Sequence, residues 1–372
     1  MDRPGAGGSA ALRRGPCTDS ARRHGSRLLV GLAFWLGTSA CSPLYVIRAG
    51  LAEARILSAR RPLAEVILDG QTDARLQGKL TLTREARIYA VEELGLDAGD
   101  AFTSYSALER DTLAMVVSAA YRTRLAARTW WFPIVGHVPY RAYFDFEAGA
   151  RERAKLEAEG FDALLRPTSA FSTLGWFADP LLSTTARADE VSLVETVLHE
   201  LSHNHLFVPG QVTFNESFAQ FVGNVGAMRF FCTRPGGGAD TVWCRRAQAR
   251  WRDEIRFSQF IDGLVAELET LYGRTDLSEA EKLSGREAVF QRHRERFASE
   301  VQPTFEAGRY QSFLDQPLNN ATLLGRMRYY HRLGDFDQLW RGMDQDLPGV
   351  LRALRAQAAT VADPWELLPT GR

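Results

Sequence analysis

Two histidines and a glutamate lie in one short segment with the spacing of a zinc-binding motif. The segment reads His199-Glu200-Leu201-Ser202-His203. Because side chains four residues apart lie on the same face of a helix, the two imidazoles can bind one metal ion. Glu200 lies beside them, where it can accept a proton from a zinc-bound water and act as general base. The pattern predicts one zinc ion per chain and a hydrolytic reaction.

A hydrolytic zinc ion takes three protein ligands, and Glu216 is the candidate for the third. Its segment, Asn-Glu-Ser-Phe-Ala at 215–219, resembles the Asn-Glu-x-Phe-Ala signature of gluzincin peptidases, in which the glutamate binds the metal. The metzincin alternative fails because Leu206 and Pro209 stand where that motif requires glycine and histidine. A second interpretation stays open, since Thr213 and Glu216 also have the spacing of a helix-capping box. The expected ligands are His199, His203 and Glu216.

The oxyanion that forms during hydrolysis needs a further hydrogen-bond donor near the metal, commonly a tyrosine, a histidine or an arginine. Several residues of these types occur, and their spacing does not choose among them. The candidates are Tyr140, Tyr143, Tyr329, Tyr330 and His331.

The zinc motif requires a helix, and the sequence predicts one from Asp189 onward. Apolar residues supply one side of this helix for the core, while polar residues and the two histidines follow the other side. His205 lies on a different face from His203, so we expect it to pack or to support the site. After a turn at 209–210, a second helix carries a stripe of small residues that permits close packing. These are Ala219, Gly223, Gly226 and Ala227.

Periodicity predicts an α+β fold of zincin-like type, with a small mixed sheet beside the His-Glu-x-x-His helix and a largely helical C-terminal half. Helices are expected before and between the strands, and nearly everything after residue 189 is expected to be helical. The expected helices are 51–67, with Pro62 as a candidate break, 73–94 and 146–159, and the expected strands are 113–119, 129–135, 161–165 and 169–174. Residues 136–139 are expected to end the second strand, and the helical half is expected to break at 209–210, 234–238 and 317.

The first forty residues have the pattern of a signal peptide of the lipoprotein type. Arginines precede an apolar stretch at 28–40, and small residues then precede Cys41. We expect residues 1–40 to be removed, Cys41 to be lipidated, and residues 41–372 to form a single metallopeptidase domain. This predicts anchoring to the bacterial outer membrane, facing the periplasm; a plain signal peptide and a soluble periplasmic protein are the alternative.

Composition and cysteine usage agree with an exported enzyme. The 372 residues include 45 basic and 45 acidic side chains, and this balance argues against a nucleic-acid-binding protein. Cys17 lies in the leader, so that Cys232 and Cys244 are left in the mature chain besides Cys41. In an oxidising periplasm we expect these two to form a disulfide, which would stabilise the fold by roughly 3 kcal/mol.

Over most of its mature length the chain resembles the predicted zinc aminopeptidase family of proteobacterial lipoproteins. The resemblance implies a peptide substrate and favours Tyr329 as the oxyanion stabiliser. The segments that carry it are 41–43, 60–62, 139–144, 172–184, 199–203, 215–219, 319–321 and Tyr329.

Aminopeptidase action would require an acidic group that binds the free amine of the substrate. Asp145, Glu147 and Asp179 are candidates, and the sequence selects none of them. An extended substrate could bind along an edge strand at 172–174 by β-augmentation. An endopeptidase, a hydrolase of non-peptide amides and a non-catalytic, membrane-tethered scaffold lipoprotein are the alternatives.

Overall fold

The structure is a computed structural model that describes most of the chain after residue 55. The described residues are 56–108, 112, 114–132, 136–168, 179–308 and 310–369, and all fall in the compact unit Ile47–Arg372. The signal peptide, Cys41 and the expected edge strand at 172–174 lie outside them. Among the described helices, none combines the length and hydropathy that a membrane span requires.

In the N-terminal part, Pro62 interrupts the expected helix 51–67. Arg61–Pro62 is a short strand, β1, because Pro62 adopts an extended conformation with φ −53° and ψ 133°. The helix α3, Leu63–Leu68, starts only after it. β1 pairs with β2, Ser104–Ser106, which in turn lies parallel to β8, Leu181–Leu182. This sheet of strands β1, β2 and β8 is mixed, as expected.

The next helix, α4, spans Ala74–Glu92, close to the expected 73–94. Asp73 caps it by accepting hydrogen bonds from the backbone amides of Arg75 and Leu76. The buried side of α4 packs against α7, the helix that carries the zinc motif.

A second sheet is antiparallel and has the strand order β6-β3-β7. Its central strand β3, Ala114–Ala120, and β7, Asp162–Thr168, correspond to two expected strands. β6, Tyr140–Tyr143, was not expected, because four residues are too few to show alternation of polar and apolar residues. The helix α5, Phe146–Ala158, corresponds to the expected helix 146–159, and it packs on β3 and β7.

The expectation that residues 136–139 end the second strand is wrong. Gly136–Val138 forms the strand β5, which pairs antiparallel with β4, Trp130–Phe132, in a two-stranded sheet. A positive φ of 70° at Gly136 suits glycine. Residues 136–138 therefore belong to a strand themselves.

The C-terminal half is helical, as predicted, and the breaks at 209–210, 234–238 and 317 all fall between helices. A further break at 297–311, with short π and 3-10 turns at Phe297–Val301 and Gln302–Thr304, was not expected. The helices are α6 Ser183–Ala186, α7 Glu190–His205, α8 Val212–Thr233, α9 Val242–Gly273, α10 Glu279–Arg296, α11 Ser312–Asp315, α12 Asn320–Tyr330, α13 Leu333–Gly342 and α14 Leu347–Gln357, followed by a 3-10 turn at Pro364–Leu367.

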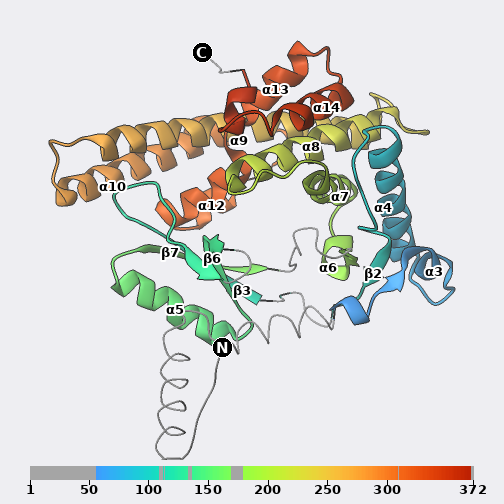
Figure 1. The fold of residues 1–372 in the computed structure, drawn as a ribbon, viewed down its shortest axis with the longest axis horizontal. Coiled ribbons are helices and arrows are strands. Elements are labelled where there is room, and N and C mark those ends of the chain that lie inside the picture. The colour runs from blue at the N-terminus through green and yellow to red at the C-terminus, as the bar shows by residue number, and fades with distance from the viewer. Residues whose placement is uncertain are drawn as a thin grey trace, which may run out of the picture. The chain divides into compact units, whose positions relative to one another are not determined.

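Helix α12 connects the helical half with the antiparallel sheet. It contacts α8 and α9 on one side and β3 and β7 on the other (Figure 1). Its first residue, Asn320, is fully buried and donates a hydrogen bond of 2.8 Å to the carbonyl of Tyr121, just after β3. The backbone amide of Asn320 donates to Asp162 of β7. These bonds fix the start of the helix that ends at Tyr330.

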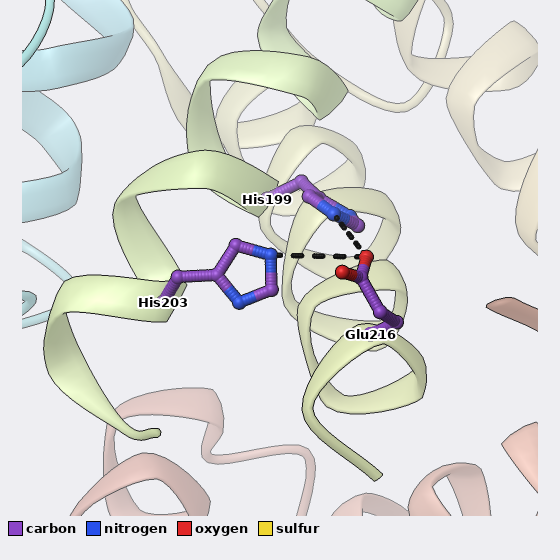
Figure 2. A group of neighbouring side chains, drawn as sticks. All are labelled: His199, His203 and Glu216. Carbon is purple, nitrogen blue, oxygen red and sulfur yellow. Dashed lines mark ion pairs between the residues drawn. The ribbon is translucent and has the colours of Figure 1, made fainter. Parts of the chain in front are cut away.

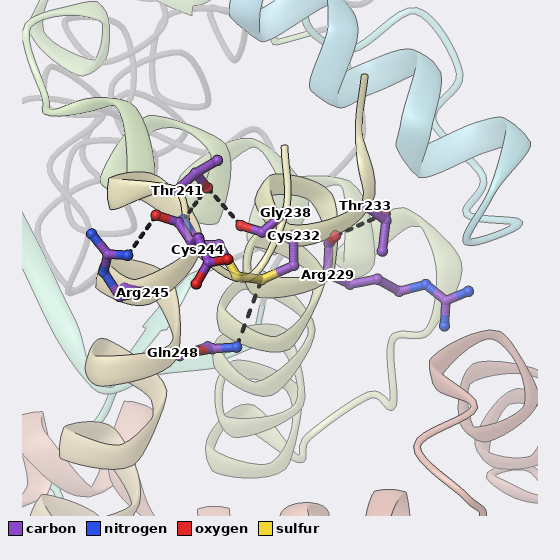
Figure 3. Close-up of a disulfide and its surroundings, with 9 residues drawn as sticks. Arg229, Cys232, Thr233, Gly238, Thr241, Cys244, Arg245 and Gln248 are labelled. Carbon is purple, nitrogen blue, oxygen red and sulfur yellow. Dashed lines mark hydrogen bonds between the residues drawn. A yellow bond between two sulfur atoms is a disulfide. The ribbon is translucent and has the colours of Figure 1, made fainter. Parts of the chain in front are cut away.

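A disulfide closes the connection between α8 and α9. Cys232, at the end of α8, and Cys244, at the start of α9, are bonded with their Cα atoms 4.8 Å apart (Figure 3). The hydroxyl of Thr241 accepts a hydrogen bond from the amide of Cys244 and caps α9. The intervening chain is therefore held at both ends.

Helices α7 and α8 pack closely against each other (Figure 1), and two glycines of the small-residue stripe of α8 face α7. A Cβ atom at Gly223 would lie 2.7 Å from the carbonyl oxygen of Glu195 and 3.2 Å from the Cβ of His199. A Cβ atom at Gly226 would lie 2.8 Å from a methyl group of Leu198. The absent side chains permit this close approach, which sets the distance between the two helices.

We predict that Gly223→Ala destabilises the protein by about 1–3 kcal/mol, because the new methyl group must push the two backbones apart. Gly263→Ala, on α9, is the matched control, since a Cβ atom there would meet no atom of the described residues within 4 Å. That change should stabilise the helix by about 0.5–1 kcal/mol. Urea unfolding measures both, and a Gly223→Ala protein as stable as the wild type would contradict the packing described.

Candidate metal centre

The zinc-motif helix α7 is fixed at its start by a buried arginine from another helix. Asp189 caps α7 by accepting from the amide of Ser192. The guanidinium of Arg250, on α9, lies 3.1 Å from Asp189 Oδ1, 2.7 Å from Ser192 Oγ and 2.5 Å from Glu195 Oε2. Arg250 is only 2% exposed. These contacts therefore fix the orientation of the first turns of α7 relative to α9.

The turn between α7 and α8 determines where Glu216 lies. Asn215 accepts a hydrogen bond of 2.9 Å from the amide of Val208 and donates one of 2.8 Å to its carbonyl. Gly210 supplies a positive φ of 80° in this turn. The chain reverses here, and α8 presents its first turn to the histidines of α7.

The capping-box interpretation of Glu216 is wrong. Helix α8 begins at Val212, its N-cap residue is Gln211, and no side chain caps it. Thr213 therefore lies inside the helix, and the carboxylate of Glu216 is not used to cap it.

Glu216 lies instead beside both histidines of the motif (Figure 2). Its Oε2 atom lies 3.4 Å from Nε2 of His199 and 3.8 Å from Nε2 of His203. One ligand atom from each of the three residues lies within 4.8 Å of the other two, and among the described residues this is the group of side chains that could hold a metal ion. The structure thus brings together the three side chains that the sequence predicted as ligands.

The geometry of this group fits a shared metal ion. Both distances exceed those of good N–H···O hydrogen bonds, which are about 2.7–3.2 Å. A tetrahedral zinc ion with bonds of about 2.0–2.2 Å separates its ligands by roughly 3.4 Å. Two imidazole nitrogens and one carboxylate oxygen are a donor set found in catalytic zinc sites.

The charge states of two ligands suit metal binding. Burial and then the charge of His199 lower the pKa of His203 to about 4, so that its imidazole is neutral near pH 7 and can donate a lone pair. Burial opposes ionisation of Glu216, but the nearby imidazole of His199 and the charges of both histidines hold the pKa of this carboxyl below its ordinary value.

Glu200 is partly buried next to this group without belonging to it. Burial raises the pKa of Glu200, the charge of His199 opposes the shift, and the carboxylates of Glu216 and Asp179 add to it. A carboxylate with a raised pKa is a stronger base than an ordinary carboxylate.

The ring of Tyr329 lies near the ring of His199. The two ring centroids are 6.2 Å apart. Burial, and then the charge of Glu216, raise the pKa of Tyr329 to about 12, so that its hydroxyl remains a hydrogen-bond donor at any ordinary pH.

Other oxyanion candidates have different contacts. Tyr330 packs its ring edge-on against Phe257, at 4.8 Å, and His331 lies 2.7 Å from a carboxylate oxygen of Asp262. The ring of Tyr140 lies beneath the guanidinium of Arg328, at 5.5 Å. These contacts use the side chains for packing or for ion pairing.

The three acids considered for amine binding have different surroundings in the structure. Asp145 caps α5, and Glu147 is an exposed residue that pairs with Arg151. Asp179 is the one whose charge acts on Glu200. His205 is buried, and its Nδ1 atom lies 3.4 Å from Arg355.

A cavity of about 450 Å³ adjoins His199 and Glu200. Its lining includes Glu195 from α7 and Glu254 from α9, both buried. Burial raises the pKa of each of these carboxyls to about 7. No sequence pattern indicated Glu254 or Arg250 as site residues, since only the packing of α9 on α7 and α8 brings them here.

A family model described as "Putative aminopeptidase" matches residues 44–363 of the chain. Neither a curated protein nor a solved structure matches the chain significantly.

Proposed function

The chain belongs to the family described as "Putative aminopeptidase", whose model spans residues 44–363, and on that premise we propose that it is a zinc-dependent aminopeptidase. His199, His203 and Glu216 would hold the zinc ion. The observation that carries the proposal is the clustering of their ligand atoms within 4.8 Å. The partly buried acid that follows His199 in the sequence adds to it, because a purely structural site would not need Glu200.

Zinc, when bound, would lower the pKa of a coordinated water and polarise the carbonyl group of the substrate. In this proposal Glu200 takes the proton of the attacking water and delivers it to the leaving amine. The raised pKa of Glu200 suits the second step, since a stronger base holds the proton until the amine departs. His199 and His203 orient the reaction by fixing the metal between α7 and α8.

Tyr329 would donate a hydrogen bond to the oxyanion that develops on the substrate carbonyl. Its position beside His199 and its protonated hydroxyl support this role. The fixed start of α12 at Asn320 supports it further, because α12 carries Tyr329 near its other end.

We predict that Glu200→Gln retains zinc and loses hydrolysis of aminoacyl and peptide substrates by about 10²–10⁴-fold, since only proton transfer is removed. Glu216→Gln should instead weaken zinc binding. The loss of affinity should exceed the roughly 10–100-fold that follows when a residue that only supports a ligand is changed. Metal analysis and initial rates measure both. Full activity of Glu200→Gln would refute the proposed mechanism.

Tyr329→Phe should lower kcat by about 10²–10³-fold, the loss expected for one oxyanion donor, and should leave zinc content and KM nearly unchanged. Tyr140→Phe is the matched control, because Tyr140 is exposed and its ring contacts Arg328. Steady-state kinetics on both variants test the role. A Tyr329→Phe enzyme with the kcat of the control would exclude it.

We also propose that the mature protein is anchored by lipid at Cys41 and faces the periplasm. Cys41→Ser should then move the protein from the membrane fraction to the soluble fraction, since the acyl chains would have no attachment site. Cys17→Ser, in the leader, should leave the protein in the membrane fraction. Retention of the Cys41→Ser protein in membranes would contradict the anchor.

A further inference from the structure

One arginine of strand β7 lies on the face of the sheet that α12 covers. A Cβ atom at Gly325 of α12 would lie 3.6 Å from a methyl group of Leu164, so the side of β7 that carries Leu164 faces the helix. Arg166 follows Leu164 by two residues in the strand, and alternate residues of a strand point to the same face. The side chain of Arg166 therefore leaves the sheet on the side of α12.

A second arginine, Arg328, comes to the same region from α12. It follows Gly325 by three residues, and Tyr329 follows Gly325 by four. Residues three and four apart are neighbours on a helix surface, so Arg328 and Tyr329 share the side that Gly325 presents to β7. The proposed oxyanion donor and an arginine are thus adjacent on this side of α12.

The contact of Arg328 with the sheet agrees with this placement. Its guanidinium lies 5.5 Å from the ring centroid of Tyr140, on β6. Tyr140 and Leu164 both pair with Ser118 of the central strand β3, and directly paired residues point to one face of a sheet. Arg328 therefore lies over the same face of the sheet as Arg166.

Both arginines are close enough to the proposed site for their charges to act on it. Burial and then the charge of Glu216 raise the pKa of Tyr329, and the charges of Arg328 and Arg166 oppose this shift. Burial also opposes ionisation of Glu216, whereas the two histidines of the motif and Arg328 lower its pKa. The two guanidiniums therefore lie near the hydroxyl that would donate to the oxyanion.

Neither guanidinium is occupied by another part of the protein that the structure describes. Both side chains are partly exposed, and neither makes a hydrogen bond or an ion pair with a described residue. By contrast, Arg326, two residues before Arg328, donates to the carbonyl of Ser312 at 3.1 Å. A guanidinium can bind a carboxylate through two parallel hydrogen bonds, which are stronger than bonds between neutral groups.

The charges around the site favour a negatively charged group of the substrate here. Glu216, Glu200 and Asp179 are acids whose charges act within the site. The proposed zinc ion would offset the carboxylates of Glu216 and Glu200. The two guanidiniums then face the single negative charge of Asp179, so an additional anion would be attracted to them.

We propose that Arg166 and Arg328 bind a carboxylate of the substrate, so that the enzyme prefers peptides with a carboxylate near the scissile bond. The carboxylate is either the C-terminal group of a short peptide or the side chain of an aspartate or a glutamate. This inference deepens the proposed function and rests on it, because it assumes that the substrate reacts beside Tyr329.

The test is calorimetric titration of the zinc-loaded Glu200→Gln protein, which should bind peptides without hydrolysing them. Leucylglycine and its amide differ in the C-terminal carboxylate, and leucylglutamate amide and leucylglutamine amide differ in a side-chain carboxylate. We expect the carboxylate to strengthen binding by about 10-fold or more in at least one pair, because it adds charge-assisted hydrogen bonds.

Arg166→Gln and Arg328→Gln, each added to this protein, should remove most of that preference and leave the affinity for the neutral peptides nearly unchanged. Arg153→Gln is the matched control. It removes the same charge from an exposed position of α5, which packs on the other face of the sheet, where Leu165 lies 3.2 Å from a Cβ atom placed at Gly149. That change should leave all four affinities as they are.

Equal affinity within both pairs would overturn the proposal, as would undetectable binding of both carboxylate peptides. A preference that either arginine variant leaves intact would also overturn it, because the carboxylate would then bind elsewhere, for example at the metal. Should one variant fail to fold, the other decides. Failure of the catalytic proposal is distinguishable, since it would appear as hydrolysis retained by Glu200→Gln, which product analysis detects.

Discussion

The close crossing of α7 and α8 is the constraint on which the site depends. Two of the three proposed ligands lie on α7 and the third on α8, so that their separation follows the distance between the helices. Gly223 sets that distance, because a side chain there would meet the backbone of Glu195 and the Cβ atom of His199. The Asn215 side chain then fixes the turn, and so the height of Glu216 relative to both histidines.

Burying charged groups around this crossing costs free energy, but their pairing also restricts the helices to one arrangement. Arg250 is removed from water and is satisfied by Asp189, which caps α7, and by Ser192 and Glu195 within it. Displacing α7 along its axis would break these contacts together and leave charged groups buried without partners. Arg250, Ser192 and Glu195 also line the cavity beside Glu200, so that the positioning of α7 and the character of the neighbouring cavity have one physical origin.

Much of the fold and the pairing of His199 with His203 on one helix could be predicted because their signals are local. Asp73, Asp145 and Asp189 each cap the helix that the sequence predicted after them, and a four-residue spacing on one helix suffices to pair His199 with His203. Strand β1 and the contacts of Arg250 could not be predicted from local signals. Pro62 pairs with a strand more than forty residues later, and Arg250 reaches a serine 58 residues before it. Such contacts follow from tertiary packing, which no local pattern encodes. Glu216 was ambiguous for the same reason, since its spacing fits a cap and a ligand equally well until the start of α8 is known.

The central claim is that His199, His203 and Glu216 hold one zinc ion where α7 crosses α8. A crystal structure of the zinc-loaded protein, with anomalous diffraction measured at the zinc absorption edge, tests it most directly. The account predicts a single strong anomalous peak per chain, bound by one nitrogen from each histidine and by the Glu216 carboxylate. An anomalous peak at other residues, or zinc-saturated protein with these three side chains free of metal, would contradict it.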